Sequence, residues 1–134
     1  MERKITEKLI EWKNQSGHLP LIIVGCRQVG KTYLIEGFGN AEYDNFIILN
    51  CDKDERISGI FEQGFRTEKL LSDIEIISGQ NVTAGRTLIF IDEVQAAPRA
   101  LSALKYFCED APEYHIIAAG SLLGLAIHEG ASFP

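Results

Sequence analysis

Eight consecutive residues combine the types and spacing that could hold a chain of phosphates. They fit the pattern G-x-x-x-x-G-K-S/T and are Gly25, Cys26, Arg27, Gln28, Val29, Gly30, Lys31 and Thr32. The two glycines let the backbone curl, so that successive N–H groups face inward and form an anion-binding nest. An apolar run over 21–24 precedes the pattern, and 32–38 can continue as a helix. This strand–loop–helix context is what a phosphate-binding loop requires.

The polar residues at the end of this pattern have distinct chemical roles in such a loop. The positive end of the following helix favours a phosphate in the nest. Lys31 is expected to reach the β- and γ-phosphates as a point charge, and the Thr32 hydroxyl to take one position on Mg²⁺. Residues 25–33, which include Tyr33, are therefore predicted to bind ATP with Mg²⁺. The alternative is a glycine-containing turn with an exposed lysine.

A second candidate group stands at the end of an apolar segment. Residues 87–91 are uncharged and rich in large or β-branched side chains, and Asp92 and Glu93 follow directly. Such a segment is typical of a strand buried on both faces of a parallel sheet, whose carboxyl end is where ligands bind. Asp92 is expected to hold Mg²⁺ through its water shell, and Glu93 to polarise the attacking water as a general base. The alternative is a strand followed by a solvated acidic turn.

Composition is typical of one globular domain. The chain has 134 residues, of which 46% are hydrophobic and 24% charged. A domain of this size buries roughly 70% of the surface of the unfolded chain. The net charge of −6 argues against broad, non-specific nucleic-acid binding. The polar N-terminus is unlike a signal peptide, no apolar run suits a membrane span, and three cysteines without C-x-x-C spacing indicate free thiols, so a cytoplasmic protein is expected.

The order of apolar segments predicts an α/β fold. Strands are expected over 21–24, 46–50, 87–91 and 114–119, and helices over 3–14, from 32 to near Gly37 and Gly39, over 67–78, from Pro98, and over 121–129. The polar stretch 52–66 is expected to form turns. Strands that alternate with helices predict a parallel sheet covered on both sides.

Periodic side chains indicate which helix faces are buried. The expected inward residues are Ile5, Leu9 and Trp12 in the first helix, Leu70, Leu71, Ile74 and Ile77 in 67–78, and Leu101, Leu104, Phe107 and Cys108 in the helix from Pro98. Thr67 is the expected N-cap of its helix. Trp12 is expected to pack on the sheet, with a place near adenine as the alternative. Arg99 is expected at a solvated helix start, with a neighbouring subunit as the alternative.

Ser121 ends the fourth predicted strand and completes the candidate site. If this strand is inserted between the strand before the phosphate-binding loop and the Asp92 strand, its end lies beside the γ-phosphate. A small polar residue there can sense the γ-phosphate or position the water. Ser121 can equally cap the helix that follows it, and one residue can do both.

Three segments together resemble the AAA+ superfamily. They are GCRQVGKT, LIFIDEVQ and IIAAGSLLG, in that order, and the resemblance spans nearly the whole chain. More narrowly, Arg27-Gln28 and the sequence Asp92 to Gln95 resemble a prokaryotic family of predicted ATPases whose core precedes a C-terminal domain of unknown function. This resemblance implies a P-loop NTPase three-layer sandwich of the AAA+ core type. It also implies the usual roles for Lys31, Thr32, Asp92, Glu93 and Ser121 in the Walker A, Walker B and sensor positions.

An AAA+ core also has a fifth strand and a helical lid, and neither is recognisable before Pro134. Residues 1–134 are therefore expected to be the N-terminal part of a longer protein, with weak turnover by themselves. A bare, apolar sheet edge would then favour self-association. No arginine finger can be assigned, and the residues indicate no particular protein or DNA partner.

The sequence leaves three functions to compare. The favoured one is an Mg²⁺-dependent ATPase whose hydrolysis changes the conformation of a longer protein. The second is a nucleotide-dependent switch that recruits protein or DNA with little turnover. The third, a phosphotransferase, is disfavoured by Glu93, because such an enzyme has little use for a water-activating carboxylate there.

Overall fold

The computed structural model describes residues 2–15, 20–25 and 29–121. Along the chain these residues form α1 (Glu2–Asn14), β1 (Leu21–Gly25), α2 (Val29–Glu42), β2 (Asn45–Asn50), α3 (Glu55–Glu62), α4 (Thr67–Ser78), β3 (Thr87–Asp92), the 3-10 turn η1 (Val94–Ala96), α5 (Pro98–Asp110) and β4 (His115–Ser121). The helix predicted over 121–129 lies outside the described residues. No helix in the described part of the chain is long and apolar enough to cross a membrane.

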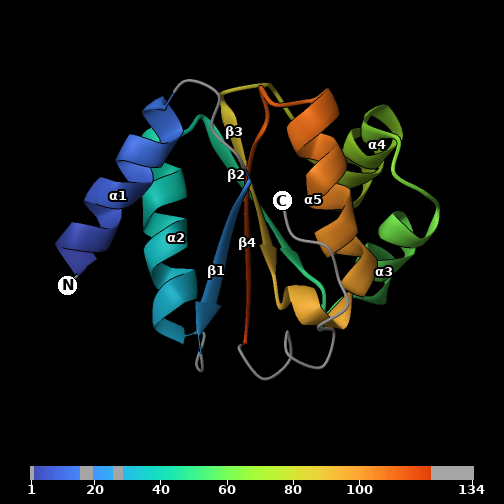
Figure 1. The fold of residues 1–134 in the computed structure, drawn as a ribbon, viewed down its shortest axis with the longest axis horizontal. Helices are drawn as coiled ribbons and strands as arrows, with labels where there is room; N and C mark the ends of the chain where they lie inside the picture. Colours follow the sequence, from blue (N-terminus) through green and yellow to red (C-terminus); the bar gives the residue numbers. More distant parts are fainter. Residues whose placement is uncertain (1, 16–19, 26–28, 122–134) are drawn as a thin grey trace.

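The four strands form one parallel sheet in the order β1-β4-β3-β2 (Figure 1). The fourth strand is therefore inserted between β1 and β3, which is the condition under which Ser121 was expected to lie beside the γ-phosphate. In the pairing register Gly25 lies beside Ser121, and Asn50 lies beside Asp92. Because all strands point the same way, their carboxyl ends meet at one edge of the sheet, as ligand sites in such sheets require.

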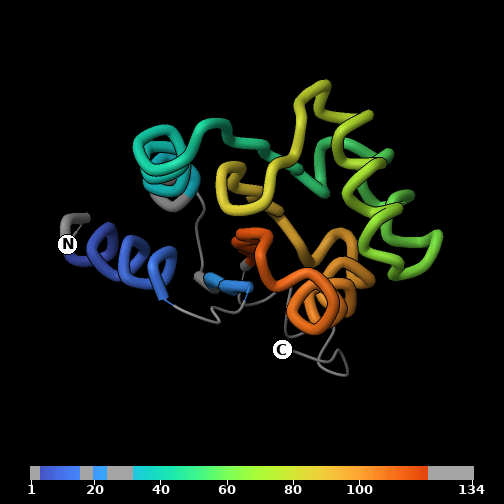
Figure 2. The backbone as a smooth tube through the Cα atoms, turned by 90° about the horizontal axis from the view of Figure 1, so that it is seen from above, coloured from blue at the N-terminus to red at the C-terminus, as the bar shows by residue number. Residues whose placement is uncertain are grey.

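Helices cover both faces of the sheet and make the molecule a three-layer sandwich (Figure 2). α1 and α2 pack on one face, and α3, α4 and α5 pack on the other. Residues of β3 alternate between the two cores: Leu88 and Phe90 face α1 and α2, whereas Ile89 and Ile91 face the other three helices. Every residue of β3 is buried, as the uninterrupted apolar run predicted.

The second helix is longer than its glycines suggested. We expected it to end near Gly37 and Gly39, but α2 continues to Glu42. Gly39 is needed for a close approach, because a Cβ atom there would lie 2.5 Å from Cδ1 of Phe46. The Phe46 ring in turn stacks on Phe90, with 6.2 Å between the ring centroids. This glycine therefore lets α2 lie against β2 and does not end the helix.

A helix occupies part of the stretch in which only turns were expected. α3 buries Ile57, Ile60 and Phe61 against the sheet and α5. The Asp54 side chain caps this helix by accepting a hydrogen bond of 3.0 Å from the backbone N–H of Arg56. The prediction of turns was wrong because a helix of eight residues offers barely two turns of periodicity.

Three further details differ from the predicted helix ends and faces. Thr67 is the first residue of α4, and the N-cap is Arg66, which makes no side-chain capping bond. In α1 the predicted inward residue Ile5 is 42% exposed, whereas Leu9 and Trp12 are buried. In α5 the predicted inward face is buried except that Cys108 is only partly so. Ile5 and Cys108 stand at the borders of their helix faces, where periodicity alone does not decide burial.

Trp12 packs in the core between α1 and the sheet, which agrees with the first of its two predicted roles. Its ring meets the His115 ring edge-on, with 5.6 Å between centroids. His115 begins β4, and its Nδ1 lies 2.6 Å from the Tyr43 hydroxyl oxygen. Burial, followed by the charge of Glu42, raises the pKa of Tyr43. This aromatic cluster therefore fastens α1 to the amino-terminal end of the sheet.

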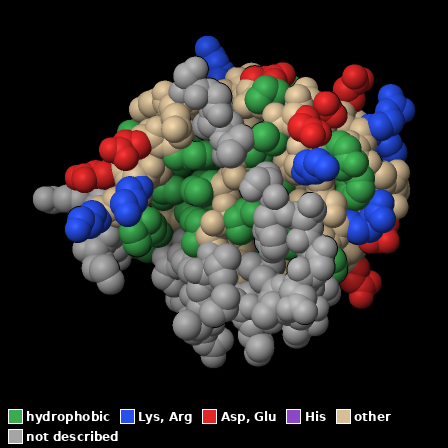
Figure 3. Space-filling view, in the orientation of Figure 1, with side chains coloured by type: hydrophobic (Ala, Val, Ile, Leu, Met, Phe, Trp, Pro, Cys, Tyr) green, Lys and Arg blue, Asp and Glu red, His purple; other side chains and the backbone are tan. Residues whose placement is uncertain are grey.

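The strand before the phosphate-binding loop lies at an edge of the described sheet. β1 pairs with β4 on one side, and its other side has no strand among the described residues. Leu21, Ile22 and Ile23 are accordingly only partly buried. On the face of the molecule seen in Figure 3, hydrophobic side chains gather in the middle, whereas charged side chains lie towards the sides.

The close contact at Gly39 predicts opposite effects for two alanine substitutions in the same helix. Gly39→Ala is expected to lower the free energy of unfolding by about 1 kcal/mol, because overpacking outweighs the gain in helix propensity. Gly37 is the matched control, since nothing lies within 4 Å of its Cβ position. Gly37→Ala is expected to raise the free energy of unfolding by about 0.5–1 kcal/mol. Equal effects in urea unfolding would contradict the close-contact explanation.

Candidate functional site

The carboxyl edge of the sheet brings the predicted site residues together on adjacent strands. Gly25 ends β1, Asp92 ends β3, and Ser121 ends β4 between them. Val29, Gly30 and Lys31 form the start of α2, so the helix begins at this same edge. Cys26, Arg27 and Gln28 lie outside the described residues, as do the side chains of Lys31 and Ser121.

A hydrogen bond joins the two predicted magnesium-binding residues. The hydroxyl of Thr32, in the first turn of α2, donates to Asp92 Oδ2 at 3.2 Å, across 60 positions of sequence. The second carboxylate oxygen, Oδ1, accepts the backbone N–H of Glu93 at 2.9 Å. Asp92 is only 4% exposed. A buried carboxylate needs such donors, so the contacts fix both oxygens of Asp92 at the edge of the sheet.

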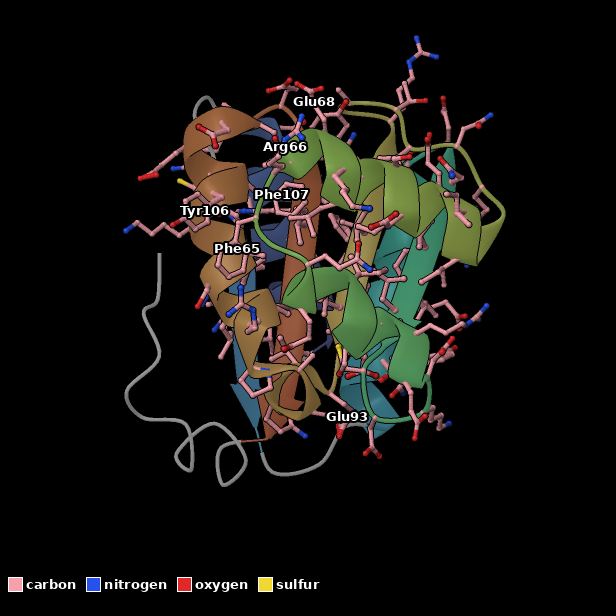
Figure 4. All side chains as sticks on the ribbon, turned by 90° about the vertical axis from the view of Figure 1, so that its right-hand side faces the viewer. Phe65, Arg66, Glu68, Glu93, Tyr106 and Phe107 are labelled. Atoms are coloured by element: carbon pink, nitrogen blue, oxygen red, sulfur yellow. The ribbon has the colours of Figure 1, made fainter. Side chains whose placement is uncertain are left out.

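The neighbouring carboxylate, Glu93, leaves the strand in a different direction. Its backbone has φ 53° and ψ 46°, which makes it the one non-glycine residue with positive φ in the described part of the chain. This left-handed conformation costs on the order of 1–3 kcal/mol for a residue with a side chain. It turns the chain out of β3 into η1, where Ala96 N–H donates to the Glu93 carbonyl at 3.0 Å. Glu93 remains partly exposed at the lower end of the sheet (Figure 4).

Gln95 contacts the side chain of Glu93 directly. Its Nε2 donates to Glu93 Oε2 at 3.1 Å. Its Oε1 is buried and has no hydrogen-bond partner among the described residues. The sequence pointed to Gln95 only through the family resemblance, because no periodicity or spacing marks a glutamine as a partner of a nearby carboxylate.

The end of β2 adds a residue that sequence reasoning did not connect with the site. The backbone N–H of Cys51 donates to the Asp92 carbonyl at 3.0 Å, and the Cys51 side chain is buried. Burial, followed by the charges of Asp92 and Glu93, raises the pKa of the Cys51 thiol to about 12. The preceding Asn50 accepts from the backbone N–H groups of Asp52 and Lys53, at 3.0 Å each, and closes a turn. Cys51 therefore packs as a neutral side chain beside the two carboxylates.

Tyr33 lies next to the site on the outer side of α2. Its side chain is 73% exposed. The ring lines an open groove of about 300 Å³ between α1 and α2, together with Thr6 and Phe38. The Tyr33 side chain is therefore accessible from solvent, and it follows Thr32, the residue that contacts Asp92.

Arg99 stands at the exposed start of α5, the first of its two predicted surroundings, and its side chain also makes specific contacts there. Its Nε donates to the Phe61 carbonyl at 3.0 Å, and its guanidinium lies 4.7 Å from the centroid of the Phe65 ring. Phe65 stacks on Tyr106 of α5 with 5.0 Å between centroids, and both rings lie well above Glu93 (Figure 4). Arg99 thus fastens the end of α3 and the chain after it to α5.

Comparison with protein families assigns the chain to a family. A family model described as an AAA domain matches residues 17–134, and the chain belongs to this family. The predicted AAA+ ATPase core is therefore confirmed, and so is the parallel α/β fold of P-loop NTPases. The predicted C-terminal domain of unknown function stays a prediction. A comparison with curated proteins found no match.

Solved structures of other proteins share the fold. A Walker-type ATPase of Pyrococcus abyssi, PABY2304, aligns with a TM-score of 0.60 and 18% identity over 96% of this chain and 47% of that one. PCH-2 of C. elegans aligns with a TM-score of 0.53 and 18% identity, over 98% of this chain and 41% of that one. The ORC1 protein of Aeropyrum pernix, solved in complex with DNA, aligns with a TM-score of 0.52 and 15% identity, over 93% of this chain and 39% of that one. The chain thus spans less than half the length of each structure, and identities this low show the fold alone.

The environment of Cys51 predicts a thiol that resists alkylation in the folded protein. At pH 8 a pKa of about 12 leaves about a thousandfold less thiolate than the ordinary value of 9.0 does. We expect iodoacetamide to modify Cys51 at least ~100-fold more slowly in the native protein than in urea, as followed by peptide-resolved mass spectrometry. Cys108, which is partly exposed, is the internal control and should be less protected. Equal rates for Cys51 in both states would show that the site edge opens readily.

Proposed function

We propose that the chain binds ATP with Mg²⁺ at the carboxyl edge of its sheet and hydrolyses it. The observation that carries this proposal is the 3.2 Å hydrogen bond between Thr32 and Asp92. It joins the last residue of the G-x-x-x-x-G-K-S/T pattern to the carboxylate at the end of β3. A chance match to the pattern would not require these two residues to meet. Membership of the AAA domain family supports the same function.

The two residues that meet are suited to a magnesium ion. Mg²⁺ is a hard cation that takes oxygen ligands and keeps several waters, and here a hydroxyl and a carboxylate oxygen lie side by side. Thr32 would hold the ion directly, and Asp92 would hold it through its water shell. When bound, the ion neutralises negative charge on the β- and γ-phosphates. Asp92, fixed through both oxygens, keeps this position without further rearrangement.

The start of α2 supplies the contacts to the phosphates. In this proposal the backbone N–H groups from Gly25 to Gly30 surround the phosphates, and Lys31 places its charge on the β- and γ-phosphates. The beginning of α2 at Val29, directly at the edge of the sheet, supports this because the helix dipole then points at the same place. The exposed ring of Tyr33 contributes a surface for the nucleoside beside Thr32.

Glu93 and Ser121 act on the water in this proposal. The carboxylate of Glu93 accepts the proton of the attacking water as a general base, and its partial exposure keeps it accessible. Ser121 ends β4, the strand between β1 and β3, and so stands between the phosphate-binding loop and the acidic pair. From that place its hydroxyl contacts the γ-phosphate or the water.

Hydrolysis is proposed to serve a longer protein of which residues 1–134 are the nucleotide-binding part. The structures with the same fold are more than twice as long as their matched regions, which supports this proposal. A change at the γ-phosphate would reach the rest of such a protein through β4 and the residues after it. The competing function, a switch with little turnover, differs in its dependence on Glu93 and is therefore an outcome of the second experiment below.

The first experiment removes the charge that holds the phosphates. Lys31→Ala in the full-length protein is expected to weaken MgATP binding about ten- to a hundredfold, because a charge-assisted contact contributes ~1.5–3 kcal/mol. Calorimetric titration measures the affinity. Lys105→Ala, which removes an exposed lysine of α5, is the matched control and should bind as the wild type does. If Lys31→Ala bound as tightly as this control, the assigned phosphate site would be wrong.

The second experiment separates hydrolysis from binding. Glu93→Gln is expected to keep MgATP affinity and to slow turnover ~10²–10⁴-fold, because it removes a general base. Asp92→Ala is expected to weaken the dependence of binding on Mg²⁺. Glu109→Gln, an exposed change near the end of α5, controls for the loss of one negative charge. Unchanged turnover in Glu93→Gln would favour the nucleotide-dependent switch over the ATPase.

A further inference from the structure

The side chain of Glu93 is held by one specific neighbour. Gln95 Nε2 donates to Glu93 Oε2 at 3.1 Å, and the other carboxylate oxygen has no hydrogen-bond partner in the described part of the chain. A general base in a catalytic group is commonly oriented by a third group that holds it from the far side. A glutamate with one bound and one accessible oxygen meets that need.

The turn that carries Gln95 is itself anchored. Val94, the residue before it, is fully buried in the core between the sheet and α5. The Ala96 carbonyl accepts the Ser58 hydroxyl of α3 at 3.3 Å, and Ala97 N–H donates to the Val94 carbonyl at 3.0 Å. Gln95 therefore projects from a turn whose flanking residues are fastened to α3 and to the core. Such an anchored turn is able to hold a flexible glutamate.

The amide oxygen of Gln95 indicates that this side chain does more than stabilise the fold. Its Oε1 is buried without a partner among the described residues, and an unpaired buried acceptor destabilises a fold. Turning the amide over would set this oxygen against the Glu93 carboxylate, so the contact with Glu93 fixes the orientation. A methionine of similar shape would fill the same space without the buried oxygen. What it would lack is the N–H donor to Glu93.

The backbone conformation and partial exposure of Glu93 explain what such a contact contributes. In its left-handed conformation the residue leaves the line of β3, and its side chain is only partly buried. An unrestrained, partly exposed glutamate samples several rotamers and spends a correspondingly small part of its time in any one of them. A single donor two residues further along the chain restricts this freedom.

We propose that Gln95 is a positioning residue for hydrolysis, which orients the Glu93 carboxylate towards the water without contacting the nucleotide. This inference rests on the proposed function of Glu93 as general base. It assigns to Gln95 an effect on kcat alone, because the hydrogen bond of its side chain goes to Glu93, and the bonds of Thr32 and Asp92 in the described part of the chain do not involve Gln95. The effect must also pass through Glu93.

The test compares Gln95→Met and Gln95→Glu in the full-length protein with and without Glu93→Gln. We expect Gln95→Met to lower kcat about tenfold or more with KM for MgATP within twofold, and Gln95→Glu to lower it further by repelling Glu93. The melting temperature of Gln95→Met should be equal to or above that of the wild type, since the buried oxygen is gone. Gln63→Met, at an exposed glutamine after α3, is the matched control and should leave kcat unchanged.

Single-turnover measurements in the Glu93→Gln background decide whether Gln95 acts through Glu93. If it does, adding Gln95→Met to Glu93→Gln should change the rate less than twofold, because residues that act as a unit are not additive. A full additional loss in that background, or a wild-type or raised kcat in Gln95→Met alone, would overturn the inference. Wild-type turnover in Glu93→Gln itself would instead refute the proposed function of Glu93, so the two failures are distinguishable.

Discussion

The buried carboxylate of Asp92 is the constraint on which the rest of the site depends. A charged group that is 4% exposed must find donors, and it takes one from the side chain of Thr32 and one from the backbone of Glu93. The first bond fixes the start of α2 against the end of β3. The second turns the chain out of the strand and sets the direction of Glu93. One carboxylate thus determines where the phosphate-binding helix begins and where the second acidic side chain goes.

The sheet can hold that carboxylate because β3 is buried on both faces. Leu88 and Phe90 pack under α1 and α2, and Ile89 and Ile91 pack under α3, α4 and α5. Placing β4 between β1 and β3 separates the phosphate-binding loop from the acidic pair by the width of one strand. Thr32 bridges that separation from α2, and Ser121 stands at the end of the strand that fills it. In the proposed function, the terminal phosphate of a bound nucleotide lies at the end of this strand.

Two kinds of contact stabilise the surroundings without belonging to the site. At the amino-terminal end of the sheet, Trp12, Tyr43 and His115 join α1 to the strands. On the opposite face, Arg99 joins the end of α3 to α5 through the Phe61 carbonyl and the Phe65 ring. Both use polar or charged groups that a sequence reader would consider for function. Their partners are structural, and they leave the acidic edge of the sheet to the residues from the two motifs.

The sequence by itself determined the strands, most helices and the order of layers, because long apolar runs and a motif with fixed spacing are local signals. It also placed Thr32 and Asp92 at one edge, since parallel strands end together. Only the tertiary structure decided the rest. Gly39 allows close packing and does not end α2, α3 forms because its apolar residues meet α5, and Gln95 meets Glu93 because that glutamate adopts a left-handed backbone. Each of these depends on a neighbour or a backbone angle that residue type and spacing do not specify.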